Sequence, residues 1–217
     1  MSGEFALFWS RMRVLIFLLS LNVHAEILST AVGTYRGGHV LTSRHVQMDQ
    51  MVDAALNGAG KESLKLLALD SRAFAKATQS ALLESVVALE AKGFNVVNVT
   101  AQEQKDAEKK VVSALKNNTG WKGLEPTPKE IEAILARKLQ AKKFIQFRTQ
   151  SSLLPVTELE AQKYFNENRL KFGNLPFENF KENIKSFLSR TQVDKRLKDW
   201  YDLLQNKYQV KSLIAEG

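Results

Sequence analysis

The sequence predicts a mainly helical protein with a small β-sheet formed by its N-terminal hairpin and its C-terminal strand. Three observations lead to this fold class. The composition, 44% hydrophobic and 25% charged over 217 residues, is that of an ordinary globular chain. Three Ser/Thr-x-x-Glu capping boxes stand before stretches with helical apolar spacing. Short strand-like runs occur only near the two ends, at residues 27–42 and 208–214.

The N-terminal run predicts a β-hairpin followed directly by a helix. Residues 27–34 and 39–42 are expected to be strands, and Gly37 and Gly38 between them supply the positive φ that a tight turn needs. Ser43 is expected to cap a helix whose apolar spacing runs from Val46 to residue 56.

The rest of the chain predicts five further helices. One covers residues 71–92 and ends at Gly93. The capping boxes that begin at Thr100, Thr127 and Thr157 each start another, and a last long helix runs over residues 177–206. The segment 117–123 is expected to be a loop, and residues 208–214 a strand.

Two of these helices change their apolar face halfway along. After Pro128 the first apolar stripe ends at Leu139, and Phe144 and Phe147 fall on nearly the opposite side. In the last helix, one stripe runs from Phe177 to Leu188 and the other consists of Val193, Leu197, Trp200 and Leu204. Either each half packs against a different neighbour, or one half stays open as a binding surface.

The first residues have the pattern of a secretory signal peptide. Arg11 and Arg13 precede a short apolar run, and Ala25 is a small residue at its exit. We expect cleavage between Ala25 and Glu26 and localisation in the periplasm or elsewhere outside the cytoplasm; a retained membrane anchor is the alternative. Residues 1–25 carry Arg11, Arg13 and Glu4, so their removal lowers the formal net charge from +8 to +7.

Composition also excludes several classes of function. The chain has no cysteine, which excludes disulfides, thiol catalysis and cysteine metal sites. Its basic excess is suited to attract anionic partners or a membrane surface. The lysines are spread among acids along helices without an aromatic platform, so nucleic acid is not an expected partner.

The string GGHVLTSRHV, residues 37–46, looks like the strand that carries the catalytic histidine of a serine protease. That chemistry also needs a carboxylate and a serine in a glycine-rich oxyanion loop, and no Gly-Asp-Ser-Gly-like segment follows. His45 is therefore expected to lie at the start of a helix without a catalytic role. His39 and His45 have no carboxylate at ligand spacing beside both, so no metal site is expected.

The N-terminal hairpin with the helix that follows it, and the C-terminal part of the chain, resemble a known family. A strand reading Ala-Val-Gly, a glycine turn and VLTSRHV entering a helix that ends VDAAL resemble the opening of SurA-type periplasmic chaperones, relatives of PpiD and PrsA. LPVTELEAQKYFNENRLKF, residues 154–172, looks like the helix that leads into their parvulin domain. Residues 175–210 look like the long helix and strand that follow it.

The resemblance implies one chaperone-like helical domain over residues 26–217, with an N-terminal segment 26–150 and a C-terminal segment 151–217. The parvulin domain that separates the two matching segments in the family is missing here between Phe172 and Pro176, so no isomerase activity, enzyme activity or cofactor is expected. The implied function is a holdase that binds unfolded envelope or outer-membrane polypeptides. A non-catalytic assembly subunit for one envelope partner is the alternative.

Four side chains are candidates for contacting such clients: Met48, Met51, Phe144 and Phe147. Methionine and phenylalanine suit irregular apolar clients because they adapt their shape or offer a large contact area. A core position is the more common place for such residues, and the sequence leaves both interpretations open.

Overall fold

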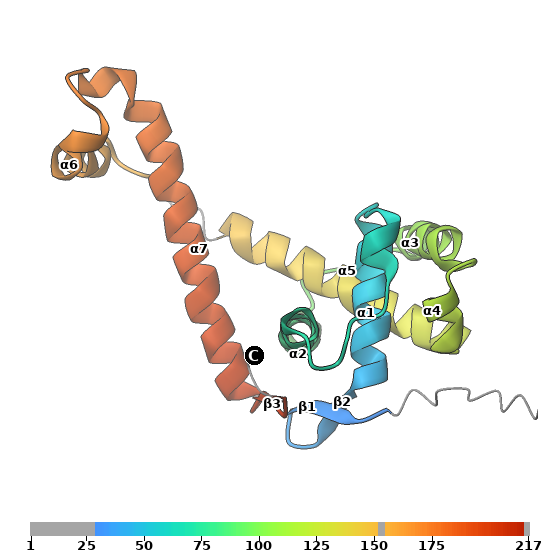
Figure 1. The fold of residues 1–217 in the computed structure, drawn as a ribbon. Helices are drawn as coiled ribbons and strands as arrows, with labels where there is room; N and C mark the ends of the chain where they lie inside the picture. Colours follow the sequence, from blue (N-terminus) through green and yellow to red (C-terminus); the bar gives the residue numbers. More distant parts are fainter. Residues whose placement is uncertain (1–28, 152–154, 215–217) are drawn as a thin grey trace, which may run out of the picture.

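The computed structural model describes residues 29–151 and 155–214, and it confirms the predicted fold class (Figure 1). The predicted signal segment and its cleavage site between Ala25 and Glu26 lie outside the described residues. In chain order the described strands and helices are β1 (Ala31–Tyr35), β2 (His39–Thr42), α1 (Ser43–Leu56), α2 (Arg72–Phe94), α3 (Ala101–Leu115), α4 (Thr119–Gly123), α5 (Pro128–Ser151), α6 (Glu158–Glu167), α7 (Lys181–Lys207) and β3 (Lys211–Ser212). Short 3-10 helices cover Lys61–Leu64 (η1), Arg169–Lys171 (η2) and Phe177–Asn179 (η3).

The two ends of the described chain meet in one antiparallel sheet. Its strand order is β2-β1-β3, so the C-terminal strand pairs with the N-terminal hairpin as predicted. Gly33 pairs with Ser212, and the Leu213 amide donates to the Val32 carbonyl at 2.9 Å. A Cβ on Gly33 would lie 2.8 Å from Leu82 of α2, so the absence of a side chain lets this strand pack closely on the helix.

Side-chain caps fix most helix starts where the sequence places them. The Thr100 and Thr157 capping boxes are formed, and the Thr127 amide likewise donates to Glu130 Oε2 at 2.8 Å. The first helix is an exception, because Thr42 rather than Ser43 is its N-cap and accepts from the His45 amide. The second helix passes Gly93 and ends at Phe94, and its C-cap residue Asn95 takes the left-handed conformation with φ 49°.

The prediction of a loop at residues 117–123 is wrong, because this segment contains α4. Asn118 caps the short helix by accepting a hydrogen bond from the Trp121 amide at 2.9 Å. The Trp121 side chain is buried in the core, which stabilises one turn that propensity alone does not favour.

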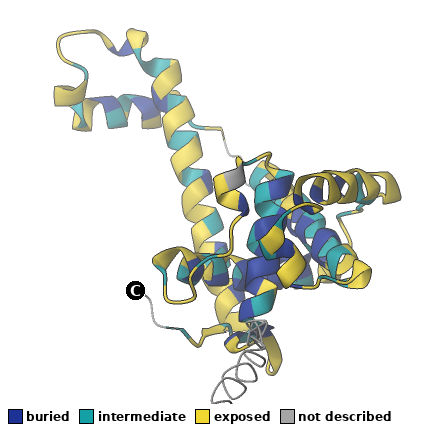
Figure 2. Ribbon diagram, turned by 45° about the vertical axis from the view of Figure 1, so that its right-hand side comes forward, coloured by how far each residue is buried: buried dark blue, intermediate teal, exposed yellow. Residues whose placement is uncertain are grey.

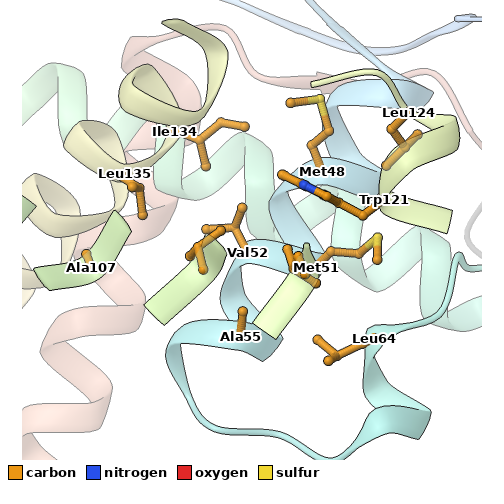
Figure 3. Close-up of a cluster of buried hydrophobic side chains, with 12 residues drawn as sticks. Met48, Met51, Val52, Ala55, Leu64, Ala107, Trp121, Leu124, Ile134 and Leu135 are labelled. Atoms are coloured by element: carbon orange, nitrogen blue, oxygen red, sulfur yellow. The ribbon is translucent and has the colours of Figure 1, made fainter. Parts of the chain in front are cut away.

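Residues 29–151 and 193–214 form what we call the body, which contains three apolar clusters. The first joins α1, α3, α4 and α5 (Figure 3), the second joins α2, α5 and the C-terminal half of α7, and the third joins the hairpin to α1 and α2. The C-terminal residues of the body are held by polar contacts as well. The Tyr208 hydroxyl and the Lys207 ammonium each donate to Glu90 Oε2 on α2 at 2.7 Å.

Residues 157–188 form what we call the arm, which has a fourth cluster of its own. Its buried members are Ala161, Phe165, Phe177 and Ile184, and further aromatic rings pack around them. Helix α7 therefore packs its first stripe in the arm and its second in the body, with an exposed stretch between them (Figure 2). Helix α5 makes the same change between the first and second body clusters. This confirms the first of the two interpretations, in which each half of the helix packs against a different neighbour.

Candidate functional site

Three of the four predicted client-contacting side chains are buried, so their assignment as surface contacts is wrong for this structure. Met48 and Met51 have no exposed surface and lie in the first body cluster with Trp121 and Leu124 (Figure 3). Phe144 is also completely buried, in the second cluster. All three lie on helix faces that distant elements cover, which makes them packing residues.

Phe147 is the exception, because 40% of this residue is exposed. It stacks on the buried Phe144 ring with a centroid distance of 6.1 Å. On another side of Phe144 lies Phe94 at 5.6 Å, and this residue at the end of α2 is 54% exposed. We call Phe94 and Phe147 the aromatic patch. Phe94 lies beyond the helix end predicted at Gly93, and the asparagine at position 95, a residue type common after helix ends, was the sequence signal for a later end.

Helix α7 packs against Phe144, the buried ring that both residues of the aromatic patch contact. The Trp200 ring meets Phe144 edge to face at 5.7 Å, and the Arg148 guanidinium lies 5.1 Å from the Trp200 ring centroid. The aromatic rings are thus held in a fixed arrangement, and a cation borders them.

An open groove runs beside the contact between α5 and α7, with a volume of about 650 Å³. Its apolar lining is Pro155, Val156, Val193 and Leu197, and its polar lining includes Ser189 and Arg190. Leu197 also packs against the second body cluster, so the groove and the aromatic patch border the same cluster. Together they offer apolar surface with polar and cationic edges, a combination suited to contact with a polypeptide of varied sequence.

The two described histidines do not join this surface. His45 lies in the first turn of α1, where its Nδ1 is 2.8 Å from Thr42 Oγ1, and burial together with Arg44 lowers the pKa of its imidazole. His39 stacks on Tyr35 in the hairpin at 5.3 Å. Ser43, beside His45, is buried and its hydroxyl accepts from the Thr30 amide at 3.2 Å. These contacts organise the hairpin-helix corner.

The strongest electrostatic feature is a charge network inside the body, which we call the central network. Arg137 of α5 pairs with Asp49 of α1 and lies 3.3 Å from Glu84 of α2. Its neighbour Lys138 pairs with Asp53 at 2.8 Å and with Glu84 at 2.9 Å. Burial raises the pKa of Glu84, while Lys138 and Arg137 oppose that rise. The network joins three helices, and removing one partner of such a buried pair would leave another charge uncompensated.

Comparisons with known proteins assign this chain to no family. A scan against protein-family models, a search of curated proteins and a search of solved structures found no match to this chain. Across residues 29–151 and 155–214, no helix is both long and apolar enough to cross a bilayer. The same residues contain no group of three or more histidine, aspartate or glutamate side chains placed to hold a metal ion.

Proposed function

We propose that this protein is an exported, non-catalytic holdase of the SurA type that binds unfolded envelope or outer-membrane polypeptides. The observation that carries the proposal is the exposure of Phe94 and Phe147 around the buried Phe144, beside the groove between α5 and α7. The resemblance of the two end segments to SurA-type chaperones points the same way, and the signal-peptide pattern supplies the route to the periplasm.

The physical reasoning concerns affinity and tolerance. Transient capture requires apolar area that stays in water in the free protein, because covering it is the gain that holds the client. Two phenylalanines over a rigid ring cluster provide such area at a small entropic cost of binding. An open groove with serine and arginine on its wall tolerates polar and apolar side chains in turn.

The test is suppression of aggregation, measured by light scattering with several unrelated unfolded proteins. The double variant Phe94→Asp/Phe147→Asp should lose most of the suppression, because each aspartate makes the patch polar and charged. Val112→Asp is the matched control, since Val112 is a similarly exposed apolar residue of α3. Equal loss in both variants, or none in the double variant, contradicts the assignment of the patch.

Crosslinking in cells separates this proposal from the alternative function. A holdase should trap many β-rich envelope proteins, and the Phe94→Asp/Phe147→Asp variant should trap fewer of all of them. A single trapped partner, together with no suppression of aggregation, would identify a dedicated assembly subunit.

A further inference from the structure

The connection between α6 and α7 forms the end of the arm farthest from the sheet (Figure 1). We call residues 168–177 the arm tip. It contains η2, a turn in which Gly173 takes the left-handed conformation with φ 59°, and the start of η3. Leu170 is 100% exposed there and Leu175 is 51% exposed. A single exposed leucine is common on protein surfaces, so its meaning here depends on its position at a protruding turn and on the charged residues beside it.

The cations on either side of Leu170 are held in place. The Arg169 guanidinium lies 4.7 Å from the Phe165 ring centroid and donates to the Leu175 carbonyl at 2.7 Å. The Lys171 ammonium lies 5.8 Å from the Tyr164 ring centroid. Successive side chains of a 3-10 helix diverge by about 120°. Both cations therefore fold back over the rings of the arm while Leu170 projects alone.

Charge at the tip has one sign. Residues 168–177 contain Arg169 and Lys171 and no acidic residue, the exposed Glu167 and Glu178 lie directly outside them, and the whole chain carries a formal net charge of +8. A projecting leucine with two cations set behind it matches the layering of an anionic bilayer surface, where acyl chains lie beneath the phosphates. Long basic side chains reach the headgroups while a neighbouring apolar side chain enters the boundary below them.

We infer that the arm tip adsorbs reversibly to anionic lipid surfaces by inserting Leu170, with Leu175 beside it, while Arg169 and Lys171 contact the headgroup phosphates. A protruding turn cannot enclose an extended polypeptide, whereas a bilayer deforms around it. For this reason the tip fits a lipid surface better than it fits a client. The inference is independent of the proposed holdase function, which rests on the aromatic patch of the body.

The absence of cysteine permits a site-specific test in the full chain. Leu170→Cys and Leu203→Cys each receive a polarity-sensitive fluorophore, and Leu203 is the matched control because it is an exposed leucine at the other end of α7. On vesicles of phosphatidylglycerol and phosphatidylethanolamine, the label at 170 should shift to shorter wavelength and the label at 203 should not. Added salt or pure phosphatidylcholine should weaken the shift, because screening and neutral headgroups remove the electrostatic attraction. Residues 1–28 are the same in every variant, so a difference between the labels reports the tip.

A second measurement places the label at Leu175→Cys and adds Leu170→Glu. The lipid concentration for half of the shift should rise by about tenfold or more, because a leucine side chain no longer enters the boundary. No shift at position 170 on anionic vesicles, or an equal shift at position 203, overturns the inference. A shift caused by an unfolded polypeptide without lipid also overturns it and assigns the tip to client binding. Aggregation suppression by Leu170→Glu should match that of the parent chain, which keeps this result separate from the holdase proposal.

Discussion

The body and the arm are held together by the same helix, α7, in different ways. In the body, α7 packs Trp200 and Leu204 against α2 and α5, and the chain beyond it returns to the first strand. In the arm, α7 packs Ile184 against α6 in a cluster with only four buried residues. The body adds buried ion pairs between three helices, whereas the arm pair Lys181–Glu158 lies at the surface.

This difference shows how one continuous helix can join two regions of unequal stability. A larger shared core makes the body unfold as a unit, because each cluster shares a helix with another. The arm has little buried area of its own, so local opening should cost less there. Four measurements test this difference in stability between the body and the arm.

The largest effect is expected from Trp200→Ala. Trp200 is the largest side chain of α7 in the second body cluster, and its removal should cost about 3–5 kcal/mol of unfolding free energy. That is a large share of the roughly 5–15 kcal/mol typical of a domain. Deleting residues 208–217 should likewise lower the main transition, since it removes β3 and the Tyr208–Glu90 bond. The exposed Leu203→Ala is the control, and a main melting temperature unchanged by Trp200→Ala would contradict the shared core.

Lys138→Met should be the next most destabilising change. It leaves Asp53 and Glu84 without the ammonium that both contact, and breaking one side of a buried pair costs about 3–5 kcal/mol. Water can reach the partly exposed Asp53, so we expect the lower end of that range. Urea unfolding measures it, with the exposed Lys142→Met as control on the same helix. If both variants unfold at the same urea concentration, the central network does not stabilise the body.

A smaller, pH-dependent effect is expected from Glu130. The hydrogen bond from Arg44 lowers the pKa of its carboxyl to about 2, with a further contribution from Thr127. Since this folded-state pKa lies below the ordinary value of 4.5, the stability it contributes is present above about pH 4.5 and is lost as the pH falls towards 2. Glu130→Gln should cost about 1–2 kcal/mol at neutral pH, and this cost should become small as the pH falls to about 2.

The arm contains a matched case for this measurement. Glu160 closes a capping box with Thr157, and that contact lowers the pKa of the Glu160 carboxyl. No arginine takes part in it among the described contacts. Glu160→Gln should therefore change the pH dependence of the main transition less than Glu130→Gln does. Equal pH profiles for the two variants would show that Arg44 adds nothing.

The smallest effect on the main transition is expected from Phe165→Ala. Phe165 contacts Phe172 and Phe177 in the arm, so its removal should open the arm and leave the body folded. Hydrogen exchange should show lost protection in α6 and the first half of α7, with the body protected as before. A main transition lowered as much as by Trp200→Ala would mean that arm and body unfold together.

Local features of this fold could be predicted from the sequence because neighbouring residues determine them. The capping boxes at Thr100 and Thr157 form as expected, since each needs only residues three positions apart. The change of apolar face within α5 and α7 is visible in the spacing alone, but the choice between two packing partners and one open half came from the structure. The sheet joining the chain ends followed because a strand must pair its backbone groups.

Which apolar side chains remain exposed depends on how distant parts of the chain pack. Met48, Met51 and Phe144 have the same character as Phe147, yet distant elements cover the first three and leave Phe147 at the surface. The pairing of Lys138 with Glu84 joins positions 54 residues apart, and no local pattern indicates it. Burial and long-range pairing depend on where other parts of the chain lie. The sequence therefore determined the helices and strands apart from α4, which depends on the burial of Trp121, and their packing decided the surface of the candidate site.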